Sequence, residues 1–113
     1  MAIQLFQVDR YEVRLGDALS ATWSDVQVSA RGVIACHGED HRFLIYFLGE
    51  HSPVPEPVFD PGARVGAIFL PFQYLPHYVD LLRNESPIYA YLNSESPRWN
   101  SIRTTQEPVG EGE

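Results

Sequence analysis

The chain has 113 residues, of which 15 are acidic and 8 basic, so its formal net charge is −7 at pH 7. This length fits a single domain that buries its own core, and the negative charge disfavours binding to nucleic acids or to anionic membrane surfaces. The apolar run FLIYFL at positions 43–48 is far shorter than the roughly 20 residues that cross a bilayer. We therefore expect no membrane insertion.

The only cysteine, Cys36, has no second cysteine with which to form an intramolecular disulfide. The first residues, MAIQLFQVDRY, lack the basic and then apolar segments of a secretory signal. We expect a cytoplasmic protein that needs no cofactor.

Apolar and polar residues alternate in the first half of the chain. Residues 11–15 read YEVRL and residues 26–31 read VQVSAR, and this period of two predicts antiparallel strands with one solvent-exposed face. Gly16-Asp17 predicts a turn between the two strands. Gly32 predicts a bulge or sharp bend in the second strand.

The middle of the chain predicts two buried strands joined by a long loop. Residues 42–49, RFLIYFLG, are apolar on both faces, which is typical of a central strand covered on both sides. Residues 51–62, HSPVPEPVFDPG, contain four prolines and predict an extended loop that ends in a turn. Residues 63–72, ARVGAIFLPF, predict the next buried strand.

The last part of the chain predicts one helix and two strands. Residues 76–84, PHYVDLLRN, begin with a proline, which suits the first helical position, and carry apolar residues at helical spacing. Residues 88–92, IYAYL, place three aliphatic side chains on one strand face and two tyrosines on the other. Residues 99–105, WNSIRTT, predict the final strand.

This order predicts a mainly β, α+β fold. It suits a small curved antiparallel sheet or a partly open barrel of about six strands, with one short helix before the last two strands. We assign residues 1–105 to one β-rich domain. Residues 106–113, with three acidic and no basic side chains, are expected to form a flexible acidic tail.

The segment CHGEDHR at positions 36–42 suggests either a metal site or a hairpin turn. A metal site would use His37, His41 and Glu39, the ligand types that zinc or iron accepts. In a two-residue loop at Glu39-Asp40 the two histidines lie on opposite faces of the sheet, whereas a three-residue loop pairs them on one face. Glycine and aspartate, both present in Gly-Glu-Asp, are common turn residues, so we favour the turn.

Aromatic and basic residues cluster near the C-terminal strands and form a candidate binding surface. Its residues are Tyr89, Tyr91, Arg98, Trp99 and Arg103. Such a surface could contact a protein, or bases of a single strand could stack on it. The alternative is that the tyrosines pack beneath the helix or against Trp99.

Catalytic motifs are absent from the sequence: it has no phosphate-binding glycine loop with lysine, no GxSxG, no HExxH and no CxxC. We therefore expect a small binding or accessory module that acts through contacts with another protein, through self-association or as a subunit of an assembly, rather than an enzyme. Two alternatives stay open. One is a metal-binding domain or metal-dependent enzyme built on His37 and His41, and the other is a barrel that binds single-stranded nucleic acid.

Overall fold

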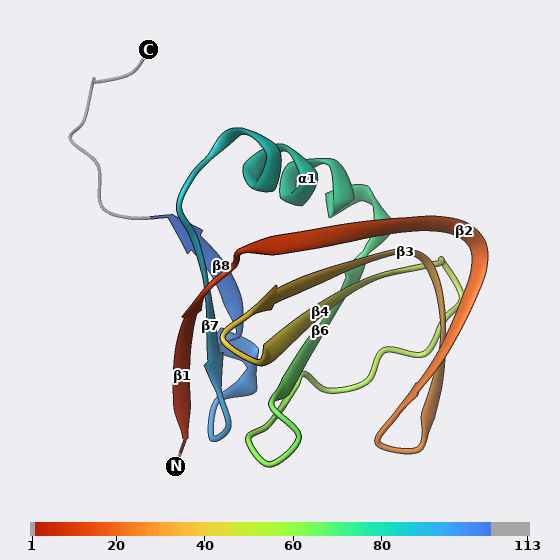
Figure 1. Cartoon of the computed structure of the whole chain (residues 1–113). Coiled ribbons are helices and arrows are strands. Elements are labelled where there is room, and N and C mark those ends of the chain that lie inside the picture. Colours follow the sequence, from red (N-terminus) through yellow and green to blue (C-terminus); the bar gives the residue numbers. More distant parts are fainter. Residues whose placement is uncertain (1, 105–113) are drawn as a thin grey trace.

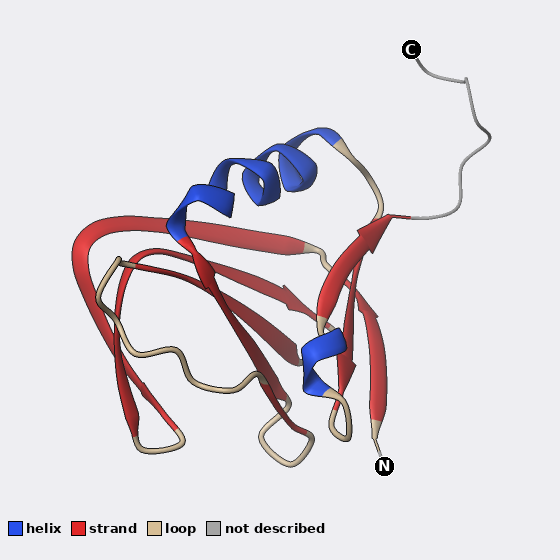
Figure 2. Ribbon diagram, turned by 180° about the vertical axis from the view of Figure 1, so that it is seen from behind, coloured by secondary structure: helices blue, strands red, loops and turns tan. Residues whose placement is uncertain are grey.

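The computed structural model describes residues 2–104 and shows two β-sheets with one α-helix across one end (Figures 1 and 2). The expected tail at residues 106–113 lies outside the described residues. The mainly β, α+β prediction is confirmed, and so is the helix before the last two strands. The elements are β1 (Ile3–Gln7), β2 (Arg10–Trp23), β3 (Val26–Gly38), β4 (His41–Leu48), β5 (Val58–Asp60), β6 (Val65–Pro71), η1 (Phe72–Tyr74), α1 (Leu75–Asn84), β7 (Ile88–Asn93), η2 (Pro97–Trp99) and β8 (Ser101–Thr104).

The strands form two sheets that do not close into a barrel. The smaller sheet has the order β1-β7-β8 and the larger one β2-β3-β4-β6-β5. One pair, β4 with β6, is parallel, which differs from the purely antiparallel sheet that the alternation predicted. The long connection through the proline-rich loop permits this, because parallel neighbours need a crossover rather than a tight turn.

The main core lies between the two sheets and beneath the helix. Phe6 and Leu92 from the smaller sheet pack with Phe43 and Phe47 of β4, and all four side chains are fully buried. Leu82 is buried on the inner side of α1 and joins the same cluster. The two sheets therefore share one core.

A second apolar cluster covers the opposite face of the larger sheet. Tyr46 of β4 stacks on Phe69 of β6 with ring centroids 5.3 Å apart, and Trp23 at the end of β2 packs edge-on against both rings. Val28 of β3 is buried in this cluster. The prediction that β4 is a central strand covered on both sides is confirmed.

The predicted turn at Gly16-Asp17 is wrong. Both residues lie inside β2, where the pairing with β3 shifts between Leu15 and Leu19. The turn is at Ser24-Asp25, whose φ angles of 49° and 65° are left-handed. Two such residues form the turn that matches the twist of a hairpin, so the glycine marks a bulge rather than a strand end.

The bulge predicted at Gly32 is confirmed by a register shift between Ala30 and Gly32. A Cβ atom at Gly32 would overlap the Cδ1 atom of Leu75 at the start of α1. The absent side chain therefore lets the helix approach the sheet.

Candidate functional site

The smaller sheet buries one face and exposes the other. Phe6, Ala90 and Leu92 are fully buried on its inner face. Because side chains alternate along a strand, Tyr89 and Tyr91 lie on the outer face, where both are half-buried. The aliphatic side of the strand faces the core, as its pattern predicted.

Strand pairing brings the outer-face residues together. Leu5 of β1 lies opposite Tyr91, and Arg103 of β8 lies opposite Tyr89. The guanidinium carbon of Arg103 is 4.4 Å from the ring centroid of Tyr91. Ile3 and Leu5 are 52% and 50% exposed. We call the surface formed by Ile3, Leu5, Tyr89, Tyr91 and Arg103 the tyrosine face.

The ring of Tyr91 is held in place by a buried asparagine. The Nδ2 atom of Asn93 donates a hydrogen bond of 3.0 Å to the Tyr91 hydroxyl. The Oδ1 atom of Asn93 accepts hydrogen bonds from the backbone N–H groups of Glu95 and Ser96. The polar end of Tyr91 is thus bound within its own sheet, while its ring faces outward with Arg103.

The other two residues of the sequence-based surface, Arg98 and Trp99, belong to η2, which contacts β7. Arg98 in η2 contacts the proline-rich loop through Glu56, with 3.6 Å between the Nη2 and Oε2 atoms. Trp99 is 68% exposed, and within residues 2–104 its ring forms no stacked or edge-on pair with Tyr89 or Tyr91. Strand pairing therefore brings Tyr89, Tyr91 and Arg103 together, while Arg98 and Trp99 lie in η2, between the end of β7 and the start of β8.

The sequence did not reveal Ile3 and Leu5 as part of this surface. They belong to β1, whose sequence IQLFQ places apolar side chains on both faces, because Phe6 points into the core. The regular alternation of apolar and polar residues that predicts a half-buried strand is therefore absent from this segment. The sequence showed only a short apolar segment near the N-terminus.

The CHGEDHR segment forms a hairpin with a two-residue turn. His37 pairs with Arg42 and Gly38 pairs with His41, and the turn residues Glu39 and Asp40 have φ angles of 47° and 63°. This is the register in which the two histidines lie on opposite faces of the sheet. The favoured turn is what the structure shows.

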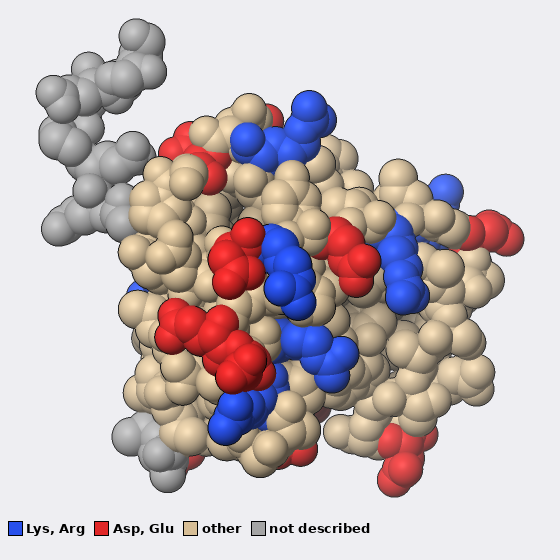
Figure 3. Space-filling view, viewed as in Figure 1, with Lys and Arg blue, Asp and Glu red and all other residues tan. Residues whose placement is uncertain are grey.

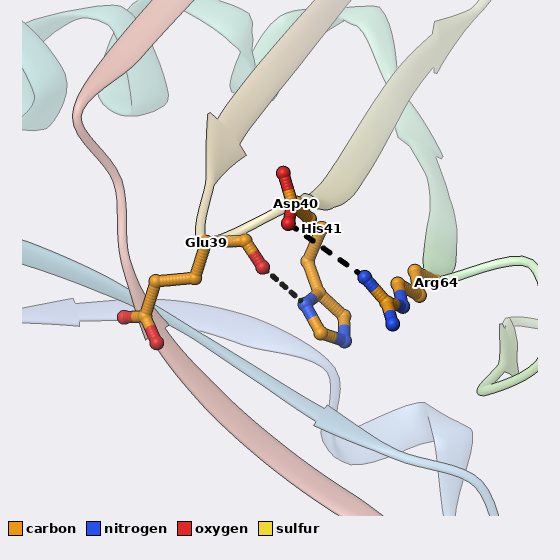
Figure 4. Close-up of polar contacts among 4 residues, drawn as sticks. All are labelled: Glu39, Asp40, His41 and Arg64. Atoms are coloured by element: carbon orange, nitrogen blue, oxygen red, sulfur yellow. Dashed lines mark hydrogen bonds and ion pairs between the residues drawn. The ribbon is translucent and has the colours of Figure 1, made fainter.

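The three residues of the metal hypothesis point in different directions. His37 faces β2, with its Nε2 atom 3.9 Å from the Glu12 carboxylate. The His41 ring stacks on Phe6, and its Nδ1 atom is 2.9 Å from the Glu39 backbone oxygen. The Glu39 carboxylate points away from that ring and accepts a hydrogen bond from the Gln7 N–H (Figure 4).

Asp40 is also bound elsewhere, since its carboxylate is 3.7 Å from the Arg64 guanidinium. Within residues 2–104 no group of three His, Cys, Asp or Glu side chains lies close enough to hold a metal ion. The hairpin therefore presents separate side chains rather than a ligand set.

The chain matches no protein-family model, no curated protein and no solved structure. Function is therefore inferred from the side chains and their surroundings, since a fold alone does not specify a function. In the described part of the chain, no helix has the length and apolar character needed to cross a membrane.

A shallow cleft lies on the other face of the larger sheet. It encloses about 210 Å³ and is lined by Arg14, His37, Arg42 and Tyr46, among others. Four other clefts on the described surface are larger, at about 330–440 Å³, and fall within the range of small-molecule sites. Cleft volume therefore does not single out one site, and the tyrosine face is distinguished instead by its exposed apolar and aromatic side chains.

Proposed function

We propose that this chain is a small, non-enzymatic protein-binding module and that the tyrosine face is its contact surface. The observation that supports this most is the exposure of Ile3 and Leu5, about half of each side chain, on a sheet face that turns to solvent. The solvent face of an antiparallel sheet is ordinarily polar. An apolar patch on such a face is typical of an interaction site.

The composition of the tyrosine face also supports protein binding. Tyrosine and arginine are enriched in the centre of protein–protein interfaces, whereas lysine and acidic residues are depleted there. Tyr91 needs little ordering on binding, because Asn93 and Arg103 already hold its ring. The partner we infer presents an apolar centre and a carboxylate that reaches Arg103.

The remaining features fit an accessory protein of the cytoplasm. The single thiol, Cys36, is free and buried, which suits a compartment where disulfides are not formed. The acidic composition favours a partner whose rim is basic.

The experiment compares partner binding by three variants of the full chain. Leu5→Glu places a charge in the centre of the tyrosine face, and Tyr89→Ala removes one of its rings. The control, Val54→Glu, alters a side chain that is 69% exposed in the proline-rich loop, away from this face. Quantitative affinity purification from the source cells identifies the partner, and titration of the purified partner then measures each affinity.

We expect Leu5→Glu and Tyr89→Ala each to weaken partner binding at least about tenfold, with both variants still folded at the temperature of the titration. Val54→Glu should bind as the unaltered chain does. The proposal fails if the two face variants bind normally, or if the control loses binding equally. Oligonucleotide binding that weakens with salt and disappears in Tyr89→Ala would instead support stacking of bases.

A further inference from the structure

β2 forms one edge of the larger sheet, whereas the tyrosine face belongs to the smaller sheet. It pairs with β3 along one side, and no strand in the described part of the chain pairs along the other. The exposed N–H and C=O groups of such an edge can pair with another chain. Pairing with β3 runs without interruption from Arg10 to Leu15, so this half of β2 is a regular edge.

The two faces of this edge have different characters. Tyr11, Val13 and Leu15 alternate along one face, and Val13 and Leu15 are 37% and 66% exposed. Glu12 and Arg14 lie on the other face, and both are exposed. Figure 3 shows acidic and basic side chains interspersed, rather than a patch of one sign, on the side of the molecule where β2 is seen in Figure 1.

Edge strands that avoid pairing with another chain often carry charged side chains, which disfavour the approach of a second strand. Here the signs alternate, since Arg10, Glu12 and Arg14 follow one another on the same face. Within residues 2–104, neither Arg10 nor Arg14 forms an ion pair. Among the described residues, Glu12 has one ion-pair neighbour, His37, at 3.9 Å, and the Glu12 side chain is 64% exposed.

We propose that β2 is a dimerisation edge, at which two copies of this chain pair antiparallel with Val13 opposite Val13. In this register Glu12 of each copy lies opposite Arg14 of the other, so two unlike-charge pairs form on one face. On the other face Tyr11 lies opposite Leu15, and the exposed apolar side chains cover one another. Cross-strand pairs of both kinds are favourable.

Registers centred on a neighbouring residue are less favourable, because they set like charges opposite one another or pair fewer residues. Pairing about Glu12 sets that carboxylate against its own copy and Arg10 against Arg14, while pairing about Arg14 sets two guanidinium groups together; like charges directly opposite are unfavourable. Pairing about Tyr11 joins Arg10 to Glu12 but uses only the first residues of β2. The Val13 register combines matched charges with the longest regular edge.

Charge reversal tests the register. Glu12→Arg and Arg14→Glu each convert both unlike-charge pairs into like-charge pairs. The double variant, Glu12→Arg with Arg14→Glu, restores them. We expect sedimentation equilibrium of the full chain to show a reversible dimer, a dissociation constant at least about tenfold higher in each single variant, and recovery in the double variant.

Cysteine cross-linking gives a second, independent readout. Val13→Cys places a thiol opposite its own copy, within the Cα separation that a disulfide spans. It should form a covalent dimer under mild oxidation. Glu12→Cys and Arg14→Cys should cross-link efficiently only when the two variants are mixed. The native Cys36 does not interfere, because its side chain is fully buried.

Circular dichroism confirms that each variant is folded, which is expected because these side chains are exposed. The proposal is overturned if the unaltered chain is monomeric at all concentrations, or if single charge reversals leave the dimer intact. It is also overturned if the double variant does not recover, or if Val13→Cys fails to cross-link. Cross-linking of Val13→Cys to a different protein alone would show that another partner occupies this edge.

Discussion

The guanidinium group of Arg103 lies over the ring of Tyr91, with 4.4 Å between the guanidinium carbon and the ring centroid. The two residues belong to neighbouring strands, since Tyr91 pairs with Ser101 and Tyr89 with Arg103. The contact is therefore a diagonal one across the sheet, within reach of long side chains. It fixes a positive charge above an aromatic surface that faces solvent.

A double-mutant cycle measures this contact. Arg103→Ala, Tyr91→Leu and the double variant should give a coupling of about 0.5–1 kcal/mol in the free energy of unfolding, as for an exposed cation–π pair. Urea unfolding of the four proteins provides the values. A coupling near zero would mean that Arg103 is not held over the ring in solution.

Asn100 joins the two sheets. Its Oδ1 atom accepts a hydrogen bond from the Asn93 N–H at 2.9 Å, and its Nδ2 atom donates one to the Val58 carbonyl oxygen at 2.9 Å. The residue is only 4% exposed. Removing its amide leaves a buried donor and a partly buried acceptor without these partners.

Asn100→Ala should therefore lower the free energy of unfolding by about 2–4 kcal/mol, since each unpaired buried group costs about 1–3 kcal/mol. Asn84→Ala is the matched control, because that amide bonds only to exposed atoms of Asp80 on α1. The control should change stability by less than about 0.5 kcal/mol. Equal effects of the two substitutions would contradict this role of Asn100.

Sequence patterns identified most strands because their periodicity reports burial. The pattern of residues 88–92 correctly predicted which side of that strand faces the core. The apolar residues on both faces of residues 42–49 correctly predicted a strand that is covered on both sides. β5 was missed because it has only three residues beside a run of prolines. Gly16 was misread because a glycine signals a bulge as well as a turn.

The candidate surface was only partly accessible from the sequence. Tyr89, Tyr91 and Arg103 could be grouped because strand alternation puts the tyrosines on one face and Arg103 follows on the next strand. Leu5 could not be added, since its place opposite Tyr91 depends on pairing between the two ends of the chain. Nothing in the local sequence specifies such a long-range register.

Gly38 marks the point where β1 reaches the larger sheet. A Cβ atom on this glycine would overlap the carbonyl oxygen of Gln7. Nearby, the Asp9 N–H donates a hydrogen bond of 2.9 Å to the His37 carbonyl oxygen. A side chain at position 38 would push the two segments apart.

Gly38→Ala should cost about 1–3 kcal/mol of stability, as overpacking in a tight core does. Gly62→Ala is the control, because a Cβ there meets only the Asp60 carboxylate at an ordinary 3.4 Å. Thermal unfolding of both variants provides the comparison. Gly38→Ala with the stability of the unaltered chain would show that β1 does not pack as described.

Cys36 is fully buried in the main core, and burial raises the pKa of its thiol from 9.0 to about 12. Thiol reagents attack the thiolate, so at pH 8 its reaction in the native state should be roughly a thousandfold slower than in the unfolded chain on pKa grounds alone. Reaction with Ellman's reagent, followed with and without denaturant, measures this ratio. Comparable rates would show that the thiol is accessible.

The same shift makes stability depend on pH in the alkaline range. Below pH 9 the thiol is protonated in both states and contributes no pH dependence. Between about pH 9 and 12 the unfolded chain releases this proton while the native chain retains it, so the free energy of unfolding falls by up to about 1.4 kcal/mol per pH unit.

Cys36→Ala removes this contribution while leaving every other titrating group, so the stability of this variant should decline less steeply above pH 9. Parallel slopes for the two proteins in urea unfolding from pH 8 to 10.5 would mean that the thiol ionises as readily in the folded chain as in the unfolded one.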